Sequence, residues 1–209
     1  MKLKKININL AKALEEQELA EPRAIQKQTF GTIKSGADCV IEAPKSEGKT
    51  TTIVINVIQR LEKAFQQSPR ALIFVESKEK VQEMEELFEK YGNYTDLRVY
   101  GVHEKGDVDY DKNVISAGID VLIGTPGKLN DMFATAGFDV NQLKMFVVDD
   151  AEALLKLRHD GKIVRISDSV QKSQRILFTD VLSARVESLA DRIMTEPFVF
   201  EFADEENDQ

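Results

Sequence analysis

Short apolar runs recur every few tens of residues along this chain of 209 residues, and they constrain its fold more than any other feature. They are rich in β-branched and aromatic side chains. Uninterrupted apolar runs of this length are typical of strands that are buried on both faces of a sheet. We therefore predict strands at Cys39–Ile41, Ala71–Val75, Leu97–Tyr100, Val121–Ile123, Met145–Val148, Arg175–Phe178 and Phe198–Phe202.

The segments between these runs have the spacing of amphipathic helices. Apolar side chains recur at three- and four-residue steps over 50–65, 79–91 and 184–194, which places them on one face of a helix. Strands that alternate with such helices predict an α/β fold, with a mainly parallel central sheet and helices on both faces. Ligands of such sheets bind at the carboxyl ends of the strands, so the residues after each run are the first candidates for a site.

Composition narrows the class of protein further. No window approaches the roughly 18 apolar residues that a membrane span needs, so we expect no membrane insertion. Cys39, the single cysteine, lies in an apolar run and excludes an internal disulfide; with no secretory signal peptide, this predicts a cytoplasmic location. We expect one domain over 1–203, followed by an acidic tail at 204–209. The net charge of −8 disfavours broad, sequence-independent nucleic-acid binding.

The stretch APKSEGKT, residues 43–50, follows the first predicted strand and resembles a phosphate-binding loop. Such loops read Gly-x-x-x-x-Gly-Lys-Ser/Thr, and here Ala43 takes the first position while Gly48, Lys49 and Thr50 complete the pattern. Backbone N–H groups would surround the phosphates, Lys49 would reach the β- and γ-phosphates, and the Thr50 hydroxyl would help to hold Mg²⁺. Ser46 stands where a glycine is most permissive, and a positive φ there would cost about 1–2 kcal/mol.

Carboxylates follow the predicted strand Met145–Val148 in the sequence Asp-Asp-Ala-Glu, residues 149–152. In a Mg²⁺-nucleotide site the first acid, Asp149, holds the metal and the next, Asp150, orients the attacking water. The alternative is that these acids cap the helix that begins near Ala151.

The order of the motifs resembles the first RecA-like domain of the DEAD-box RNA helicases. Pro22-Arg-Ala-Ile-Gln26 is similar to the adenine-reading Q motif, and the stretch 43–50 to motif I. Thr125-Pro-Gly-Lys-Leu129 closely matches motif Ib, 149–152 falls on motif II, and Thr179-Asp-Val181 falls where the family has Ser-Ala-Thr. The resemblance covers about residues 10–200.

The resemblance implies a RecA-like P-loop NTPase domain that binds ATP or ADP with Mg²⁺. Lys49, Asp149 and Asp150 would take the catalytic positions, with Thr50 and Asp149 at the metal. The nucleotide would be contacted by Gln26, Ala43, Ser46, Gly48, Lys49 and Thr50. RNA would be contacted weakly, at the positions of Ser77, Lys78, Gly101, Thr125, Gly127 and Lys128.

Departures from the family pattern predict poor hydrolysis. Asp150 is one methylene shorter than the usual glutamate, and a misplacement of about 1 Å at the reacting atoms can cost about 10²-fold in rate. Asp180 adds a carboxylate beside an already acidic site. We also expect no second RecA-like domain in this chain, so that a protein partner would supply it; the arginine finger that such a domain contributes is worth about 10³–10⁵ in rate.

Two other functions remain open at this level. The domain could be a non-catalytic scaffold that binds RNA or a protein partner. It could also be another P-loop enzyme, such as a small-molecule kinase, although the Q motif and motif Ib argue against that class.

Overall fold

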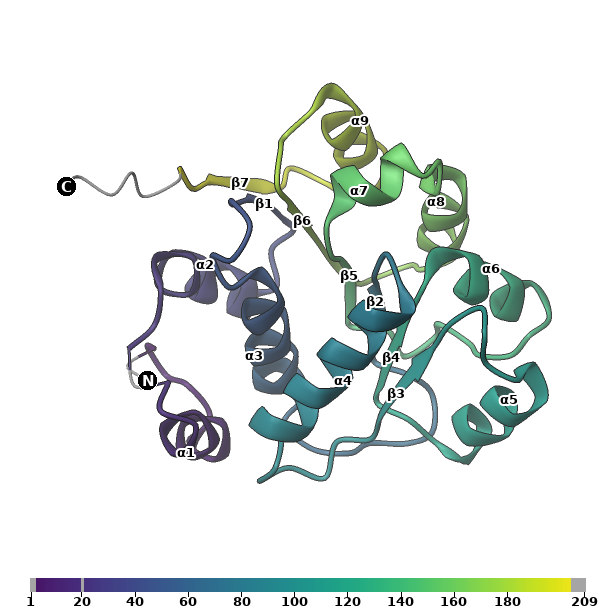
Figure 1. Ribbon diagram of the computed structural model, residues 1–209, viewed down its shortest axis with the longest axis horizontal. Coiled ribbons are helices and arrows are strands. Elements are labelled where there is room, and N and C mark those ends of the chain that lie inside the picture. Colours follow the sequence, from purple (N-terminus) through teal and green to yellow (C-terminus); the bar gives the residue numbers. More distant parts are fainter. Residues whose placement is uncertain (1–2, 20, 204–209) are drawn as a thin grey trace.

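A parallel sheet of seven strands forms the centre of the computed structural model, which describes residues 3–19 and 21–203. Every pairing between neighbouring strands is parallel. Their order across the sheet is β3-β4-β2-β5-β6-β1-β7 (Figure 1). The strands are β1 (Cys39–Glu42), β2 (Ala71–Phe74), β3 (Val99–Val102), β4 (Val121–Gly124), β5 (Met145–Val148), β6 (Gln174–Thr179) and β7 (Phe198–Glu201).

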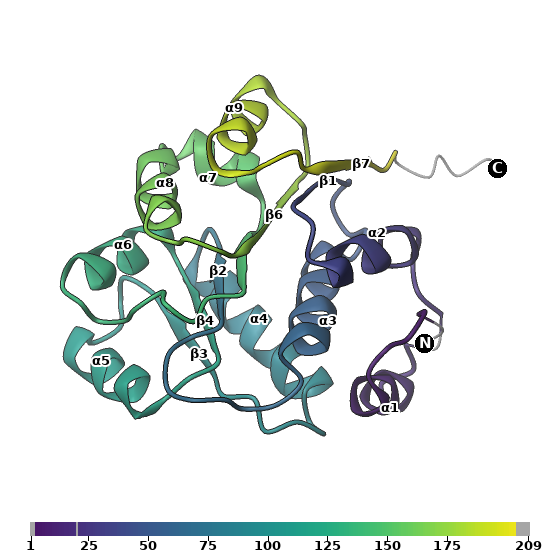
Figure 2. The same cartoon turned by 180° about the vertical axis from the view of Figure 1, so that it is seen from behind.

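Within the described residues, nine helices cover the two faces of this sheet. Helices α1–α4 pack on one face and α5–α9 on the other, as the two opposite views show (Figure 1, Figure 2). They are α1 (Ile8–Glu16), α2 (Ala24–Ser35), α3 (Lys49–Leu61), α4 (Lys78–Tyr91), α5 (Val108–Ala117), α6 (Pro126–Ala134), α7 (Ala151–Lys156), α8 (Asp160–Asp168) and α9 (Ala184–Ile193). The predicted α/β class and the helices on both faces are confirmed.

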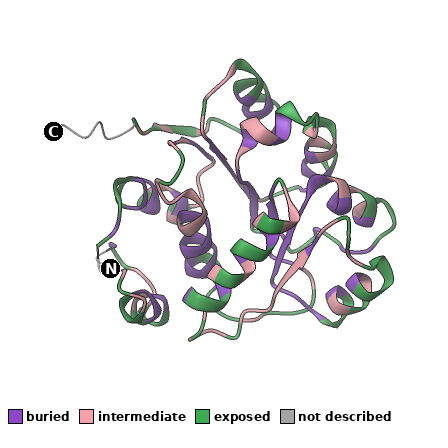
Figure 3. Ribbon diagram, viewed as in Figure 1, coloured by how far each residue is buried: buried purple, intermediate pink, exposed green. Residues whose placement is uncertain are grey.

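Two hydrophobic cores result from the pleat of the strands, because successive side chains point to opposite faces. In β1, Cys39 and Ile41 join the core under α1–α4, whereas Val40 joins the core under α5–α9. Figure 3 shows the buried residues concentrated on the sheet and on the inner sides of the helices. Burial on both faces explains why the central strands are continuous apolar runs in the sequence.

Some predicted boundaries were wrong. Helix α3 ends at Leu61 rather than at Phe65, because Glu62 has a φ of 62° and turns the chain out of the helix. Strand β3 begins at Val99 rather than at Leu97. Phe198 is exposed, since β7 is an edge strand with little helix cover. Helices α1, α2, α5 and α8 were not predicted, and the expected acidic tail lies outside the described residues.

No helix among the described residues combines the length and the apolar character needed to cross a membrane.

Buried Asp120 organises the amino edge of the sheet, just before β4. Its carboxylate accepts hydrogen bonds from Arg70 Nη2 at 2.6 Å, from Arg98 Nε at 2.9 Å and from the backbone N–H of Phe65 at 3.0 Å. The last contact holds the segment after Glu62 against the sheet. Burial alone would raise the pKa of Asp120, but the hydrogen bonds from Arg98 and Arg70 outweigh burial and lower it.

We expect Asp120→Ala to lower the free energy of unfolding by about 3–5 kcal/mol, because it leaves the buried Arg70 guanidinium without its carboxylate. Urea denaturation measures the change. The matched control is Asp168→Ala, which removes the exposed ion pair with Arg192 and should cost less than about 1 kcal/mol. Equal effects of the two substitutions would contradict a structural role for Asp120.

Candidate nucleotide-binding site

A cleft of about 600 Å³ opens at the carboxyl edge of the sheet, beside the loop that joins β1 to α3. Strand β6 lies between β1 and β5, so the loops that follow these three strands meet at one place. The cleft brings together sequence-predicted residues from α2, from the phosphate loop and from the segment after β5. These residues are Gln26, Ser46, Gly48, Lys49, Thr50, Asp149 and Asp150.

The phosphate loop has the backbone of an anion-binding turn. Ser46 has a φ of 69° and Gly48 a φ of 87°, so position 46 has the positive φ that strains a serine. A Cβ on Gly48 would lie 3.3 Å from Nε2 of Gln26, which ties that glycine to close packing as well as to its φ. Helix α3 begins at Lys49, so its free N–H groups face the cleft, where they suit an anion. Serine at 46 retains a strain of about 1–2 kcal/mol.

The ammonium group of Lys49 donates hydrogen bonds to three acceptors of the protein itself. Its Nζ donates to the carbonyl oxygens of Ala43 at 2.6 Å and Pro44 at 2.9 Å, and to the carboxylate of Asp180. Ala43 itself is buried, and its N–H donates to the carbonyl of Thr179, so it lies beneath the cleft rather than in its wall. The predicted lysine is therefore in place, with an internal carboxylate as its partner.

Asp149 is a buried carboxyl group at the end of β5. Its side chain lies in the wall of the cleft, although the residue is only 6% exposed. Burial raises its pKa to about 7, and the neighbouring charge of Asp150 adds to the increase, whereas Lys80 and Lys49 oppose it. A carboxyl group with such a pKa carries only part of its charge near neutral pH unless a cation joins it.

Asp150 caps a helix, and Glu152 links two helices. Asp150 is the N-cap of α7, where its carboxylate accepts a hydrogen bond from the N–H of Ala153 at 3.3 Å. Its φ of 53° turns the chain sharply after β5. Glu152 accepts a hydrogen bond from the hydroxyl of Ser183, which joins α7 to the start of α9. Asp150 therefore caps the helix, as the alternative interpretation of these acids expected. Its carboxylate also lines the cleft.

Gln26 lies at the end of the cleft formed by α2. It is 4% exposed, and its Oε1 accepts a hydrogen bond from the N–H of Arg23 at 2.8 Å. The Arg23 guanidinium in turn donates to the carbonyl of Ser46. These contacts connect the segment that resembles the Q motif directly to the phosphate loop.

The predicted RNA contacts lie along the ends of neighbouring strands β2, β3 and β4. Ser77 caps α4, with its hydroxyl accepting from the N–H of Lys80 at 3.3 Å, and Lys78 begins that helix. Thr125 is the N-cap of α6 and is 2% exposed. Gly101 is packed closely: a Cβ there would lie 2.3 Å from Val81. Sheet order brings these positions to one edge, as a nucleic-acid path would require.

Lys128 is buried like Thr125, and it differs from Lys78 because its charge is paired inside the protein. Its ammonium lies 2.7 Å from a carboxylate oxygen of Asp111 and donates to the carbonyl of Gly106 at 2.8 Å. Asp111 also accepts a hydrogen bond from the Tyr100 hydroxyl at 2.7 Å. The charge of Lys128 is thus neutralised inside the protein, where it joins α6 to α5.

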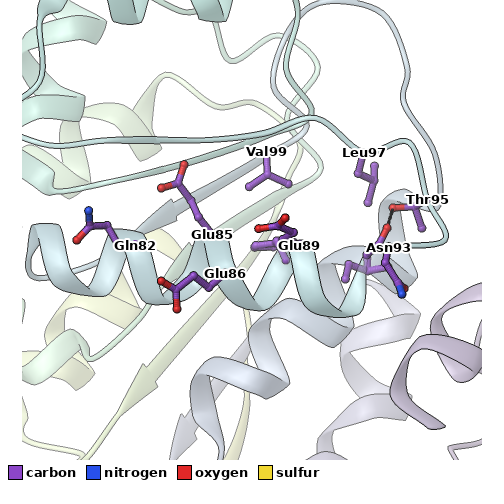
Figure 4. Close-up of a pocket in the computed structure, with 11 residues that line it drawn as sticks. Gln82, Glu85, Glu86, Glu89, Asn93, Thr95, Leu97 and Val99 are labelled. Carbon is purple, nitrogen blue, oxygen red and sulfur yellow. Dashed lines mark hydrogen bonds between the residues drawn. The ribbon is translucent and has the colours of Figure 1, made fainter. Parts of the chain in front are cut away.

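A second hollow of about 610 Å³ lies along α4, beside the start of β3 (Figure 4). Glu85, Glu86 and Glu89 line it, and burial raises the pKa of Glu85. This acidic surface would repel the phosphates of a nucleic acid. It contains none of the residues that the sequence singled out for a site.

Sequence reasoning missed several residues of the cleft. Arg23, Lys45 and Lys80 line it, and none of them was assigned a role. Asp180 was noticed only as an added negative charge, without its contact to Lys49. Its place after β6 and the adjacency of β6 to β1 together produce that contact, and strand order cannot be read from local spacing.

Comparisons with known proteins identify the family. The family model described as DEAD/DEAH box helicase matches residues 23–189. This chain belongs to the DEAD/DEAH box helicase family. The match spans the Q-like segment, the phosphate loop, the carboxylates after β5 and the segment after β6, and so confirms the resemblance read from the motifs.

Curated relatives of the chain are initiation factors and helicases of about twice its length. It is 28% identical over 180 residues to eukaryotic initiation factor 4A of Caenorhabditis elegans, covering 85% of this chain and 44% of that protein. It is 26% identical over 178 residues to the ATP-dependent RNA helicase eIF4A of Eremothecium gossypii, covering 85% and 45%. The chain therefore spans less than half the length of these relatives.

Among solved structures, a DEAD box protein from the hyperthermophile Methanococcus jannaschii superposes with a TM-score of 0.89. The identity is 17%, and the match covers 95% of this chain and 54% of the other. At this identity the likeness shows the fold, and it confirms the RecA-like architecture.

Asp149→Asn should stabilise the protein without ligand at alkaline pH. Because folding raises the pKa of Asp149 from 3.8 to about 7, its contribution is favourable in acid and is lost as the pH rises through about 7. The difference between the two pKa values corresponds to about 4 kcal/mol, at about 1.4 kcal/mol for each pH unit.

Urea denaturation of both proteins at pH 5 and pH 8 tests this expectation. The advantage of Asp149→Asn should be larger at pH 8 by about 2 kcal/mol or more. Asp168→Asn serves as the control, because it removes an exposed acid that does not line the cleft. An advantage of equal size at the two pH values would contradict a raised pKa at Asp149.

Proposed function

We propose that this DEAD-box domain binds an adenine nucleotide, ATP or ADP, together with Mg²⁺. The observation that supports it is the convergence of Lys49, Thr50 and Asp149 on one cleft that Gln26 also lines. Lysine, a hydroxyl and a carboxylate in this arrangement suit a polyphosphate and its metal. The family supports the same conclusion, since a relative is named an ATP-dependent RNA helicase.

The side chains present fit a magnesium ion that arrives with the nucleotide. The Thr50 hydroxyl and the Asp149 carboxylate are oxygen ligands, and Mg²⁺ commonly uses one or two protein carboxylates together with phosphate oxygens. Within the described residues no group of three or more acidic, histidine or cysteine side chains could hold a metal alone. When bound, the ion would supply positive charge to the phosphates, and Asp149 would hold it in its ionised form.

We further propose that hydrolysis by this domain alone is slow. The short Asp150 side chain is engaged in capping α7, so it is poorly placed to orient a water molecule. The relatives are about twice as long, which fits a requirement for a second RecA-like domain, supplied by a partner or by further chain. The loss of an arginine finger alone lowers the rate of such reactions by about 10³–10⁵.

RNA binding, in our proposal, is weak and uses the carboxyl ends of β2, β3 and β4. The N-termini of α4 and α6 lie there and suit phosphate groups. Lys78 adds a positive charge, whereas the charge of Lys128 is neutralised by Asp111. The full set of proposed contacts is Ser77, Lys78, Gly101, Thr125, Gly127 and Lys128.

We also propose that residues 1–203 form a single domain and that the protein is located in the cytoplasm.

A second candidate function is a non-catalytic scaffold for RNA or a protein partner. The observation that favours it is the engagement of Lys49 by Asp180, Ala43 and Pro44, which leaves no free donor on the ammonium. The two candidates differ in whether the cleft binds a nucleotide.

Calorimetric titration with ADP and with a non-hydrolysable ATP analogue, each with Mg²⁺, decides between them. We expect micromolar binding by the natural sequence and a loss of about tenfold or more in Lys49→Ala, because a charged contact to the phosphates is removed. The matched control is Lys63→Ala, just beyond the far end of α3, which should bind normally. Absence of binding, or equal binding by Lys49→Ala, would favour the scaffold.

Salt dependence tests the RNA contacts. For single-stranded RNA, each phosphate neutralised by a lysine contributes about 0.7 to the slope of log affinity against log salt. We expect Lys78→Ala to weaken binding a few-fold and to reduce this slope by about 0.7, measured by fluorescence anisotropy. Lys128→Ala should leave the slope unchanged, because Asp111 already neutralises its ammonium and a contact at this position would not be ionic. An unchanged slope in Lys78→Ala would show that this lysine does not meet the RNA.

A further inference from the structure

Asp180 is held opposite the phosphate loop by the sheet. Thr179, the last residue of β6, pairs with Glu42 at the end of β1, and its carbonyl accepts the N–H of Ala43 at 3.0 Å. The Thr179 hydroxyl donates to the carbonyl of Val181 at 2.8 Å and closes a tight turn around Asp180. Strand pairing and the turn therefore set the position of the Asp180 backbone, from which its carboxylate reaches Lys49.

The Asp180 carboxylate takes the place of an external anion at Lys49. A lysine ammonium has three donors, and those of Lys49 go to two carbonyl oxygens and to Asp180. The Lys49 side chain is 10% exposed and the Asp180 side chain 20%. Lys45 approaches the same carboxylate at 3.7 Å, so one acid engages both lysines of the loop.

A phosphate oxygen can reach Lys49 only if one of its three acceptors gives way. The two carbonyls belong to the backbone of the loop, and moving them requires the loop to change conformation. Asp180 is the acceptor that a side-chain rotation can remove, although the rotation separates two opposite charges. Any nucleotide must therefore compete with Asp180.

The charge of the whole cleft strengthens this competition. Its wall contains six carboxyl groups and four cationic side chains, so an added polyphosphate meets an excess of negative charge. The acids are Glu21, Glu76, Glu83, Asp149, Asp150 and Asp180, and the cations are Arg23, Lys45, Lys49 and Lys80.

We infer that Asp180 is an internal anion that competes with the nucleotide's phosphates for Lys49 and Lys45 and thereby sets the affinity of the cleft for phosphorylated ligands. This inference rests on the proposed nucleotide binding. On this inference, the segment after β6 controls how tightly the phosphates bind. Recognition of the base would be a separate role, taken by Gln26.

The test compares Asp180→Asn, which removes the charge, and Asp180→Ala, which removes the contact, with the natural sequence. Each protein is titrated calorimetrically with Mg-ADP, with inorganic pyrophosphate without metal, and with adenosine. Glu76→Gln is the matched control, since Glu76 is an exposed acid of the same cleft that makes no ion pair with Lys49 in the described part of the chain. Thermal melts verify that every variant is folded.

We expect both Asp180 variants to bind Mg-ADP and pyrophosphate about tenfold more tightly, because a charge-assisted contact no longer competes. Adenosine affinity should stay within about twofold, since adenosine has no phosphate. Glu76→Gln should change pyrophosphate affinity by less than about threefold, as expected for a screened, non-contacting charge.

Other outcomes separate this inference from the proposed function. If the natural sequence binds Mg-ADP and the Asp180 variants bind it equally or more weakly, the inference is wrong and nucleotide binding stands. If adenosine and Mg-ADP bind to no variant while pyrophosphate binds more tightly to Asp180→Asn, the proposed function is wrong, and the inference holds only for phosphate anions other than a nucleotide. If none of the three ligands binds to any variant, both are wrong.

Discussion

The parallel alignment of all seven strands is the constraint on which the rest of the molecule depends. It sends every strand's carboxyl end to the same edge, so that short connections from distant parts of the chain meet there. Insertion of β6 between β1 and β5 then fixes which segments touch. The turn after β6 must face both the phosphate loop and the carboxylates after β5, and any side chain at position 180 becomes part of the cleft. The chemistry of the site follows from strand order as much as from the motifs.

A common pattern appears along this edge, where the protein's own acids lie against its anion-binding groups. Asp180 engages Lys49, and Asp111 neutralises Lys128. A Cβ on Gly127, at the start of α6, would lie 2.9 Å from the Glu104 carboxylate, so an acid also lies near that helix N-terminus. For a chain with a net charge of −8, these contacts place negative charge where phosphates would bind. The proposed weak RNA binding and the proposed competition of Asp180 with phosphates would have this same physical origin.

Residue spacing in the sequence predicted the features of the fold that depend on neighbouring residues. The apolar runs predicted the strands because burial on both faces needs them, and the loop pattern alone marked position 46 as one where a positive φ would strain serine. The end of α3 was missed because the buried carboxylate of Asp120, 55 residues away from Phe65, holds the following segment. The pairing of Lys49 with Asp180 spans 131 positions. Such contacts depend on strand order, which residue spacing does not encode.

Three features of the cleft destabilise the protein without a ligand, and they support the proposed nucleotide site over a bare scaffold. Ser46 and Asp150 have positive φ, and Asp149 is buried with a pKa raised to about 7. Each of these lowers the stability of the empty protein near neutral pH. A metal ion beside Asp149 would offset the cost of burying its charge, and phosphates would satisfy the N–H groups that the strained loop directs into the cleft. A scaffold would gain nothing from burying the Asp149 carboxylate, whereas the proposed nucleotide site would use it to hold the metal ion.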